Sequence, residues 1–236
     1  MTVRTPTIAA LGGGGFSMEP DNDALDRWLL SLTAVSNPRV LFIPTASGDS
    51  DTYVAKFFTA FTRHTCRPSV LPLFRRTGDE LSRAVLGTDL VFVGGGNTAN
   101  MLAIWREHRL VPILRDAWER GVVLSGISAG AICWFEQGST DSFGPAPKPL
   151  NCLGFLPGSF CPHYDGEAQR RPTYQRMVVE GELQPGIAAD DGCAVLYRGI
   201  EVAEVVASRP GPSAWMITTG SGGTLSEKPI EARVLT

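Results

Sequence analysis

The sequence lacks the features of a membrane protein, a secreted protein or a nucleic-acid-binding protein. Its longest mostly apolar stretch, residues 122–135, is interrupted by serines and glycines and is shorter than the roughly 20 residues that a membrane-spanning helix needs. The N-terminus has no basic segment followed by an apolar core, so we expect no signal peptide. The net charge is −3 without a long basic run. We therefore expect neither a membrane nor a nucleic acid as a partner.

The number and spacing of the cysteines argue against a disulfide-bonded domain and against a zinc-stabilised domain. Five are present and none belongs to a CxxC pair: Cys66, Cys133, Cys152, Cys161 and Cys193. An odd number of widely spaced cysteines argues against a disulfide framework or a structural zinc site. We expect free thiols in a reducing, cytoplasmic environment, with no metal and no cofactor.

Apolar residues are plentiful, at 43% of 236 residues with 19% charged, which is enough for a large core. Buried strands are predicted at residues 7–11, 40–43, 70–73, 90–93 and 122–125. Helices are predicted between them at residues 23–35, 51–64, 80–86, 97–105 and 111–120. Apolar strands separated by amphipathic helices indicate a parallel sheet covered on both faces. We therefore predict a three-layer α/β/α fold with a mostly parallel sheet.

The last third of the chain differs from the rest. It is rich in glycine and proline and has short strand-like segments at 194–197, 202–207 and 215–218, with one helix near 171–180. This composition favours an antiparallel extension of the same domain. No repeat or linker divides the chain, so we expect a single domain over residues 1–236.

The most specific motif is Gly-Ile-Ser-Ala-Gly at residues 126–130, between a predicted strand and a predicted helix. This context is typical of a nucleophile elbow, in which a tight turn exposes the serine at the carboxyl end of the sheet. Ser128 would be the nucleophile, and the N–H of Ala129 could donate to an oxyanion. The alternative is a glycine-rich turn in which the serine has no chemical role.

A serine nucleophile needs a general base, and the chain has three histidines. His64 ends a predicted helix and His108 lies in a polar stretch, so both are expected at the surface. His163 follows an apolar run and lies at a strand end or loop, where catalytic groups often occur. If a histidine activates Ser128, His163 is the best candidate.

The carboxylate that would orient this histidine remains open from the residues alone. The candidates are Asp141, Asp165, Glu167, Asp190 and Asp191. Asp165 and Glu167 are close to His163 in sequence, which makes a bond to its ring difficult. Asp190 and Asp191 precede Gly192 and are typical of an ordinary turn.

A second glycine cluster, at residues 94–96, follows a predicted strand and precedes a helix that begins near Asn97. Backbone N–H groups in such a turn can bind an anion or a developing oxyanion. The cluster is a poor match to a dinucleotide-binding motif because no acidic residue follows at the required distance. Residues 12–15 also fail this spacing, and no P-loop lysine follows either cluster.

Together these segments resemble the peptidase E and cyanophycinase family of serine peptidases. The resemblance rests on residues 93–98, 126–131, 162–163 and 191–192, which occur in the family's order with similar gaps. It implies a class I glutamine-amidotransferase-like fold, of the flavodoxin-like type. It also implies hydrolysis of small peptides, since peptidase E removes N-terminal aspartate from dipeptides and cyanophycinases cut a β-aspartyl-arginine polymer.

The resemblance also implies roles for individual residues. Ser128 matches the nucleophile and His163 the general base, while Gly96 and Ala129 match the backbone donors of the oxyanion hole. Asp191 lies where peptidase E has a glutamate, and Asp141 lies where an aspartate has also been proposed as the acid. We favour Asp191, because a turn at the sheet's carboxyl edge could face His163.

Substrate contacts are expected near the same segments. Peptidase E has an arginine that binds the acidic side chain of its substrate, and here Arg170, Arg171 or Arg176 could take that role, although the spacing differs. The residues predicted to bind substrate are Asn97, Thr98, Asp141, Arg171 and Arg176.

These inferences predict a serine dipeptidase of the peptidase E type, a monomer or homodimer that acts on N-terminal residues, with aspartyl as one candidate. One alternative is an esterase of the α/β-hydrolase type, which has the chain order Ser128, Asp141, His163. Another is an amidotransferase-like module that binds without catalysis. A true glutamine amidotransferase is disfavoured, because those enzymes have cysteine at the position of Ser128.

Overall fold

A computed structural model describes residues 5–75 and 80–236 of the chain. Its larger sheet has eight strands. Across this sheet they are β14 (Arg233–Val234), β11 (Glu201–Ala207), β10 (Cys193–Arg198), β1 (Thr7–Leu11), β5 (Val123–Ile127), β4 (Leu90–Val93), β2 (Arg39–Ile43) and β3 (Arg67–Val70). The five strands from β1 to β3 are parallel, whereas β10 is antiparallel to both β1 and β11. The predicted, mostly parallel sheet is thus confirmed.

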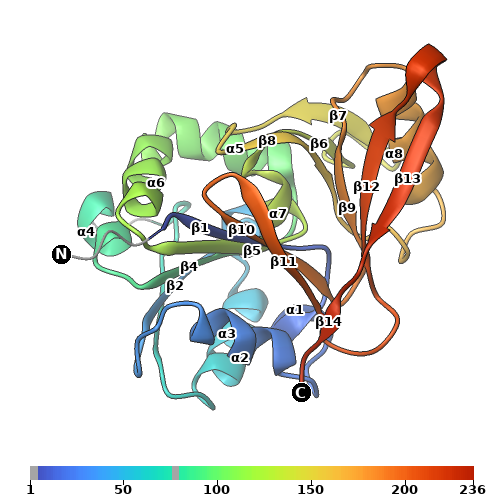
Figure 1. The fold of residues 1–236 in the computed structure, drawn as a ribbon. Helices are drawn as coiled ribbons and strands as arrows, with labels where there is room; N and C mark the ends of the chain where they lie inside the picture. Colours follow the sequence, from blue (N-terminus) through green and yellow to red (C-terminus); the bar gives the residue numbers. More distant parts are fainter. Residues whose placement is uncertain (1–4, 76–79) are drawn as a thin grey trace.

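Helices cover both faces of this sheet (Figure 1). One layer contains α1 (Gly15–Met18), α2 (Ala24–Ser31) and α3 (Asp51–Phe61), and the other contains α4 (Leu81–Leu86), α5 (Thr98–Glu107) and α6 (Leu110–Glu119). Successive strand residues point to opposite faces, so Ile8 packs in the core with Leu114 and Leu11 in the core with Phe57. This alternation confirms the three-layer prediction.

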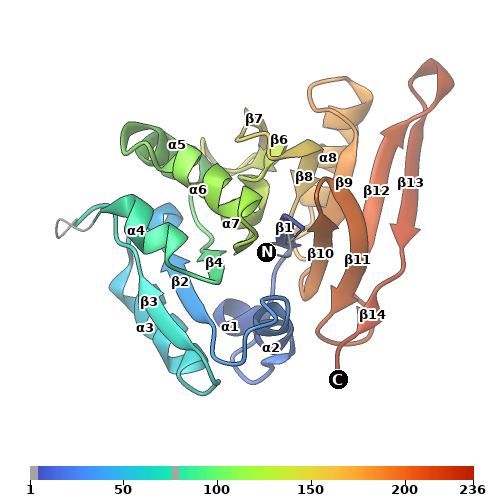
Figure 2. The same ribbon diagram turned by 60° about the vertical axis from the view of Figure 1, so that its left-hand side comes forward.

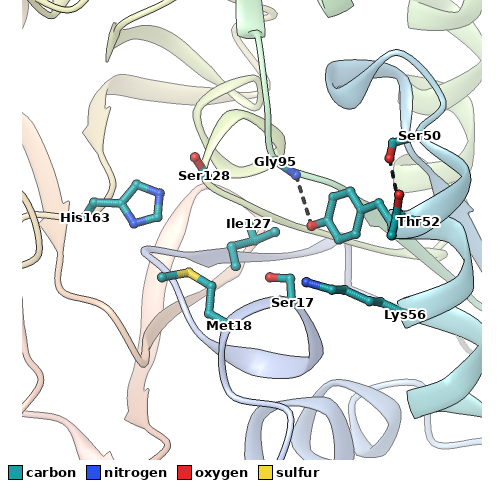
Figure 3. A pocket seen from close by; sticks show the side chains of 10 residues that line it. Ser17, Met18, Ser50, Thr52, Lys56, Gly95, Ile127, Ser128 and His163 are labelled. Atoms are coloured by element: carbon teal, nitrogen blue, oxygen red, sulfur yellow. Dashed lines mark hydrogen bonds between the residues drawn. The ribbon is translucent and has the colours of Figure 1, made fainter.

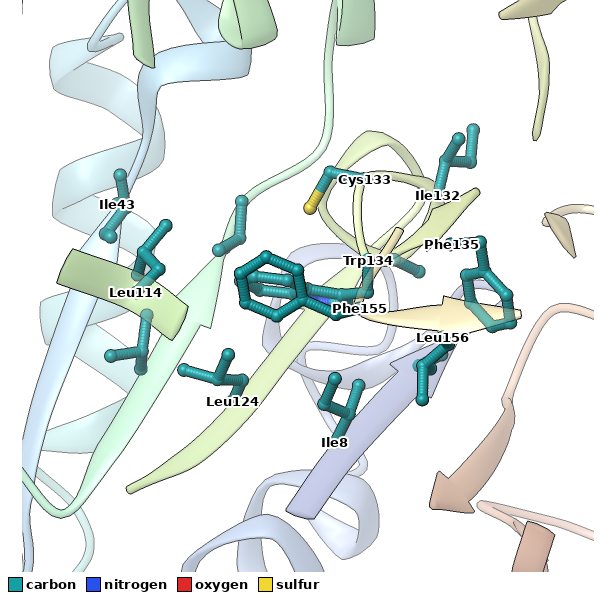
Figure 4. Packing of buried hydrophobic residues seen from close by; sticks show 14 of the residues in the cluster. Ile8, Ile43, Leu114, Leu124, Ile132, Cys133, Trp134, Phe135, Phe155 and Leu156 are labelled. Atoms are coloured by element: carbon teal, nitrogen blue, oxygen red, sulfur yellow. The ribbon is translucent and has the colours of Figure 1, made fainter. Parts of the chain in front are cut away.

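A second sheet of six strands stands beside the first (Figure 2). Its order is β13 (Leu225–Ile230), β12 (Ala214–Thr219), β9 (Gly186–Ala189), β8 (Leu156–Cys161), β6 (Phe135–Thr140) and β7 (Lys148–Asn151). One face contributes Phe135 and Leu156 to the larger core (Figure 4). Residues of α8 (Arg170–Val179) form a separate cluster with Ala188 and Ile217 of this sheet. The predicted antiparallel extension is therefore divided, with β10 and β11 in the main sheet and β12 and β13 in the second.

The helices predicted at 23–35 and 51–64 end earlier than expected, at Ser31 and Phe61, and two further departures lie at the ends of strands. The helix after residue 128, α7 (Ala129–Ile132), has a single turn, because the chain folds back at once into β6. A Cβ at Gly138 of β6 would lie 2.2 Å from a methyl carbon of Ile132. The strand expected at 70–73 instead ends at Val70, where its pairing with β2 ends. Within residues 5–75 and 80–236, no helix has the length and apolarity needed to cross a membrane.

Candidate active site

Ser128 lies in the sharp turn between β5 and α7. Its backbone angles, φ 56° and ψ −117°, are rare for a residue with a side chain, and such strain is concentrated at functional sites. The flanking glycines make the turn possible. A Cβ at Gly126 would lie 2.2 Å from the carbonyl oxygen of Gly130, and one at Gly130 would lie 2.2 Å from that of Val93. This geometry is the nucleophile elbow that the motif predicts.

The glycine turn after β4 lies directly beside the elbow. A Cβ at Gly95 would be 3.3 Å from Cβ of Ser128 and 3.8 Å from its Oγ. The N–H of Gly95 donates to the hydroxyl of Tyr53 in α3, at 3.3 Å. Burial raises the pKa of Tyr53, so its hydroxyl stays protonated. Tyr53 therefore anchors the turn next to Ser128, a contact that the sequence did not suggest.

The predicted oxyanion donors, Gly96 and Ala129, belong to these two turns. Gly96 has φ 137°, and a Cβ there would lie 2.2 Å from the carbonyl oxygen of Ala46. Ala129 is the first residue of α7, so its N–H has no acceptor within that helix. Both backbone positions are thus compatible with donation to an oxyanion next to Ser128.

His163 and Asp191 come from the second sheet and contact each other. His163 follows β8, has φ 54°, and its N–H donates to the carbonyl oxygen of Gly12 at 3.3 Å. Its Nδ1 lies 2.6 Å from Oδ1 of Asp191, and the two side chains are 15% and 23% exposed. The N–H of Asp191 donates to Oδ1 of Asp165 at 2.8 Å. A histidine held through Nδ1 has Nε2 free for proton transfer.

The N-terminal glycines explain why Asp191 can reach this place. A Cβ at Gly13 would lie 1.9 Å from Oδ1 of Asp191, and one at Gly166 would lie 2.3 Å from Oδ2. A Cβ at Gly12 would be 2.4 Å from the carbonyl oxygen of Ala189. The cluster that fails as a nucleotide-binding motif therefore serves the close approach of β1 to the turn that carries Asp191.

Ser128 and His163 face a common cavity of about 380 Å³ (Figure 3), a size typical of small-ligand sites. Its lining residues are Ser17, Met18, Ser50, Thr52, Tyr53, Lys56, Gly95, Ile127, Ser128 and His163. Among the described residues no hydrogen bond joins Ser128 Oγ to His163, and such contacts often tighten when substrate binds. The sequence did not predict that residues of α1 and α3 line this cavity, because α1 is a single short turn and the polar residues of α3 are typical of a solvent-exposed helix face.

Three predicted substrate residues are not among those that line this cavity. The side chain of Asn97 accepts from the N–H of Asn100 at 2.9 Å, so it caps α5. Thr98 is buried against Thr140, with their hydroxyl oxygens 3.2 Å apart. Asp141 is exposed in the turn between β6 and β7. None of the three lines the cavity beside Ser128.

The predicted arginines are also engaged elsewhere. Arg171 lies 2.6 Å from Glu227 and packs over the ring of Trp215 at 4.6 Å. Arg176 pairs on the surface with Glu180 and Glu182. Neither arginine lines the cavity, whereas Lys56 of α3 does.

Comparison with known proteins agrees with this geometry. A model of peptidase family S51 matches residues 8–205, a span that includes Ser128, His163 and Asp191. The chain belongs to peptidase family S51. It is accordingly a hydrolase of the serine peptidase class, as the resemblance in its sequence implied.

Two curated peptidases and one solved structure are similar to the chain over different lengths. An uncharacterized peptidase, YgaJ, of Bacillus subtilis (strain 168) is 48% identical over 228 residues, which cover 97% of this chain and 98% of that protein. Peptidase E of Shewanella denitrificans is 29% identical over 131 residues, covering 51% of this chain and 55% of that protein. The crystal structure of a peptidase from an acI-B1 Actinobacterium has a TM-score of 0.74 at 18% identity and covers 98% of this chain and 96% of that one. The last comparison shows that the fold is shared.

Proposed function

We propose that the chain is a serine peptidase that hydrolyses small peptides through Ser128, His163 and Asp191. The observation that carries the proposal is the 2.6 Å contact between His163 and Asp191, with the imidazole facing the same cavity as a strained Ser128. A nucleophile, a base and an orienting carboxylate in this order are the parts that acyl transfer requires.

In the proposed reaction, Nε2 of His163 takes the proton from Ser128 Oγ as the oxygen attacks the peptide carbonyl carbon. Asp191 accepts the Nδ1–H hydrogen bond, which selects the tautomer and stabilises the imidazolium. The backbone N–H groups of Gly96 and Ala129 are the proposed donors to the oxyanion. The imidazolium then gives its proton to the leaving amine, and the C–N bond breaks.

The second half of the reaction regenerates the enzyme. Water loses a proton to His163 and attacks the acyl ester on Ser128. The tetrahedral intermediate collapses as the proton returns to Ser128 Oγ, which releases the carboxylic acid product. This sequence needs no metal and no cofactor in the chemical steps.

For the substrate we propose small peptides cleaved next to their N-terminal residue, in the manner of a dipeptidase. This specificity rests on the relatives named peptidase E, of whose length the chain spans about half. N-terminal aspartate is one candidate residue. The catalytic unit is proposed to be a monomer or a homodimer.

Labelling with a fluorophosphonate tests the nucleophile directly. Wild-type protein should be labelled at Ser128, and Ser128→Ala should lose both the label and roughly 10⁶-fold in kcat on dipeptides. Ser31→Ala, an exposed position on α2, is the matched control and should behave as wild type. Labelling of Ser128→Ala, or activity within tenfold of wild type, would contradict the proposal. Cleavage of p-nitrophenyl esters without cleavage of any peptide would indicate an esterase instead.

A further inference from the structure

The cavity at Ser128 continues beyond the catalytic groups. A second cavity of about 530 Å³ adjoins it, and the two share Ser17, Met18, Thr52 and Lys56. We call the second cavity the α1–α3 groove, and its lining residues are Phe16, Ser17, Met18, Pro20, Thr52, Ala55, Lys56, Thr59, Ala60 and Arg63. A molecule bound at Ser128 can therefore extend along α3 from the first cavity into the second.

The groove follows one face of helix α3. Thr52, Lys56 and Thr59 are separated by four and three residues, a spacing that places them on the same side of a helix. The stretch from Thr52 to Thr59 spans roughly 10 Å at the rise of an α-helix. About three residues of extended peptide have that length. The groove thus offers room beyond the two residues of a dipeptide.

Its charge is of one sign. Among the described residues that line the groove and the catalytic cavity, the side chains with a permanent charge are Lys56 and Arg63, and there is no carboxylate. Neither cation forms an ion pair with any part of the chain that the structure describes, in contrast to Arg171 and Arg176. Lys56 extends its ammonium group toward Ser17 at the junction of the two cavities (Figure 3). An unpaired cation in this position is suited to a carboxylate of the bound molecule.

We propose that the α1–α3 groove binds peptides longer than a dipeptide, with an acidic substrate side chain at Lys56. This inference rests on the proposed function, because it places the scissile bond at Ser128. Lys56 acts here as a specificity-determining residue. Its exposure limits the expected preference to a modest factor, since solvent screens exposed ion pairs.

The first experiment measures kcat/KM for a cleaved dipeptide sequence extended by two residues, on either side of the scissile bond, with Glu, Gln or Lys. For at least one side, Glu extensions should exceed Gln extensions by about threefold to fivefold. Lys56→Glu should reverse the order in favour of Lys. Lys148→Glu on the exposed strand β7 is the matched control and should keep the wild-type order. Equal rates for Glu, Gln and Lys extensions on both sides would overturn the proposal.

The second experiment separates failure of the groove from failure of the peptidase reaction. Fluorescently labelled forms of the same peptides are bound to Ser128→Ala and to Ser128→Ala/Lys56→Glu, with folding checked by circular dichroism. If the groove binds the extension, Ser128→Ala should bind the Glu peptide more tightly than the Gln peptide by the same factor. Ser128→Ala/Lys56→Glu should lose that preference. Peptides cleaved by Ser128 but bound without charge preference would overturn the groove alone. A charge preference without any cleavage by wild type would overturn the peptidase proposal and support the groove.

Discussion

The two sheets bring the proposed catalytic side chains, and the glycine turn beside Ser128, to one region by the same geometric arrangement. In the main sheet, Gly95 and Ser128 follow the neighbouring parallel strands β4 and β5. In the second sheet, His163 and Asp191 follow the neighbouring parallel strands β8 and β9. The carboxyl ends of parallel strands meet at one edge, which is where open α/β sheets bind ligands.

The sheets differ in how firmly the local sequence marks these positions. The strand before Ser128 is a buried apolar run followed by a motif with a known turn. The strand before Asp191 is β9, which has four residues. The position of Asp191 depends on the close approach of Gly12 and Gly13, which follow β1, to the turn after β9. The proposed nucleophile is therefore placed by local sequence, and the histidine–aspartate pair by long-range packing.

The second sheet's contribution is tested most severely at Asp191. Asp191→Asn should lower kcat by roughly 10⁴-fold, because an amide in this position favours the wrong histidine tautomer. Asp141→Asn, which changes an exposed turn, should remain close to wild type. Dipeptide kinetics with circular dichroism of both variants measure this. The reverse ranking would assign the orienting role to Asp141 and would show that the contact between His163 and Asp191 is not needed for activity.

The main sheet's helical layer contains a buried acid whose effect is on stability. Asp26 of α2 is 1% exposed, and one of its carboxyl oxygens has no hydrogen-bond partner among the described residues. Burial raises the pKa of Asp26 to about 7, while the N–H of Phe16 in α1 opposes this rise. The folded protein therefore keeps this proton at pH values where the unfolded chain has lost it.

The sign of the pH effect follows from this difference. The stability that comes with protonated Asp26 is fully present below its ordinary pKa of 3.8 and is lost as the pH rises through about 7. Across this whole pH range, the contribution of Asp26 to the free energy of unfolding changes by roughly 4 kcal/mol. Urea unfolding at pH 5 and pH 8 should show a smaller decline in the free energy of unfolding for Asp26→Asn than for wild type. The exposed Asp21→Asn should decline as wild type does, and an unchanged slope in Asp26→Asn would refute the assignment.

The smallest effect is expected at the outer surface of the second sheet's helix. Arg176 of α8 is exposed and pairs with Glu180 and Glu182, and exposed ion pairs contribute little. Arg176→Ala should leave kcat/KM on aspartyl dipeptides within about twofold of wild type, since the residue lies outside the cavity. An increase of more than tenfold in KM, with kcat unchanged, would show that Arg176 contacts the substrate.

The sequence was most informative where a buried strand ends in glycine. The predicted strand at 90–93 coincides with β4, and the predicted helices at 80–86, 97–105 and 111–120 correspond to α4, α5 and α6 within one or two residues. Apolar periodicity is strong in these segments, and Gly94 and Gly121 end them sharply. The same signals identified Ser128 and its turn.

The second sheet could not be read in this way. Strand β6 has the sequence FEQGST with three consecutive buried residues at its end, so it shows neither alternation nor a continuous apolar run. Strand β9 is too short for a periodic signal. For the same reason the sequence left several carboxylates open as partners of His163. The family resemblance directed attention to Arg171 and Arg176, neither of which lines the cavity, whereas Lys56 does.

The sequence by itself determined the parallel α/β core, the elbow at Ser128 and, through combined motifs, the peptidase family, and it selected His163 as the candidate base. The core and the elbow depend on residues that are neighbours in the chain, where spacing and side-chain type limit the possible conformations, whereas the family was inferred from the order of four separate motifs. The tertiary structure decided that Asp191 contacts His163, that Tyr53 holds the glycine turn, and that Lys56 borders the cavity. Each of these joins elements far apart in sequence, and their meeting depends on how the two sheets and α3 pack together.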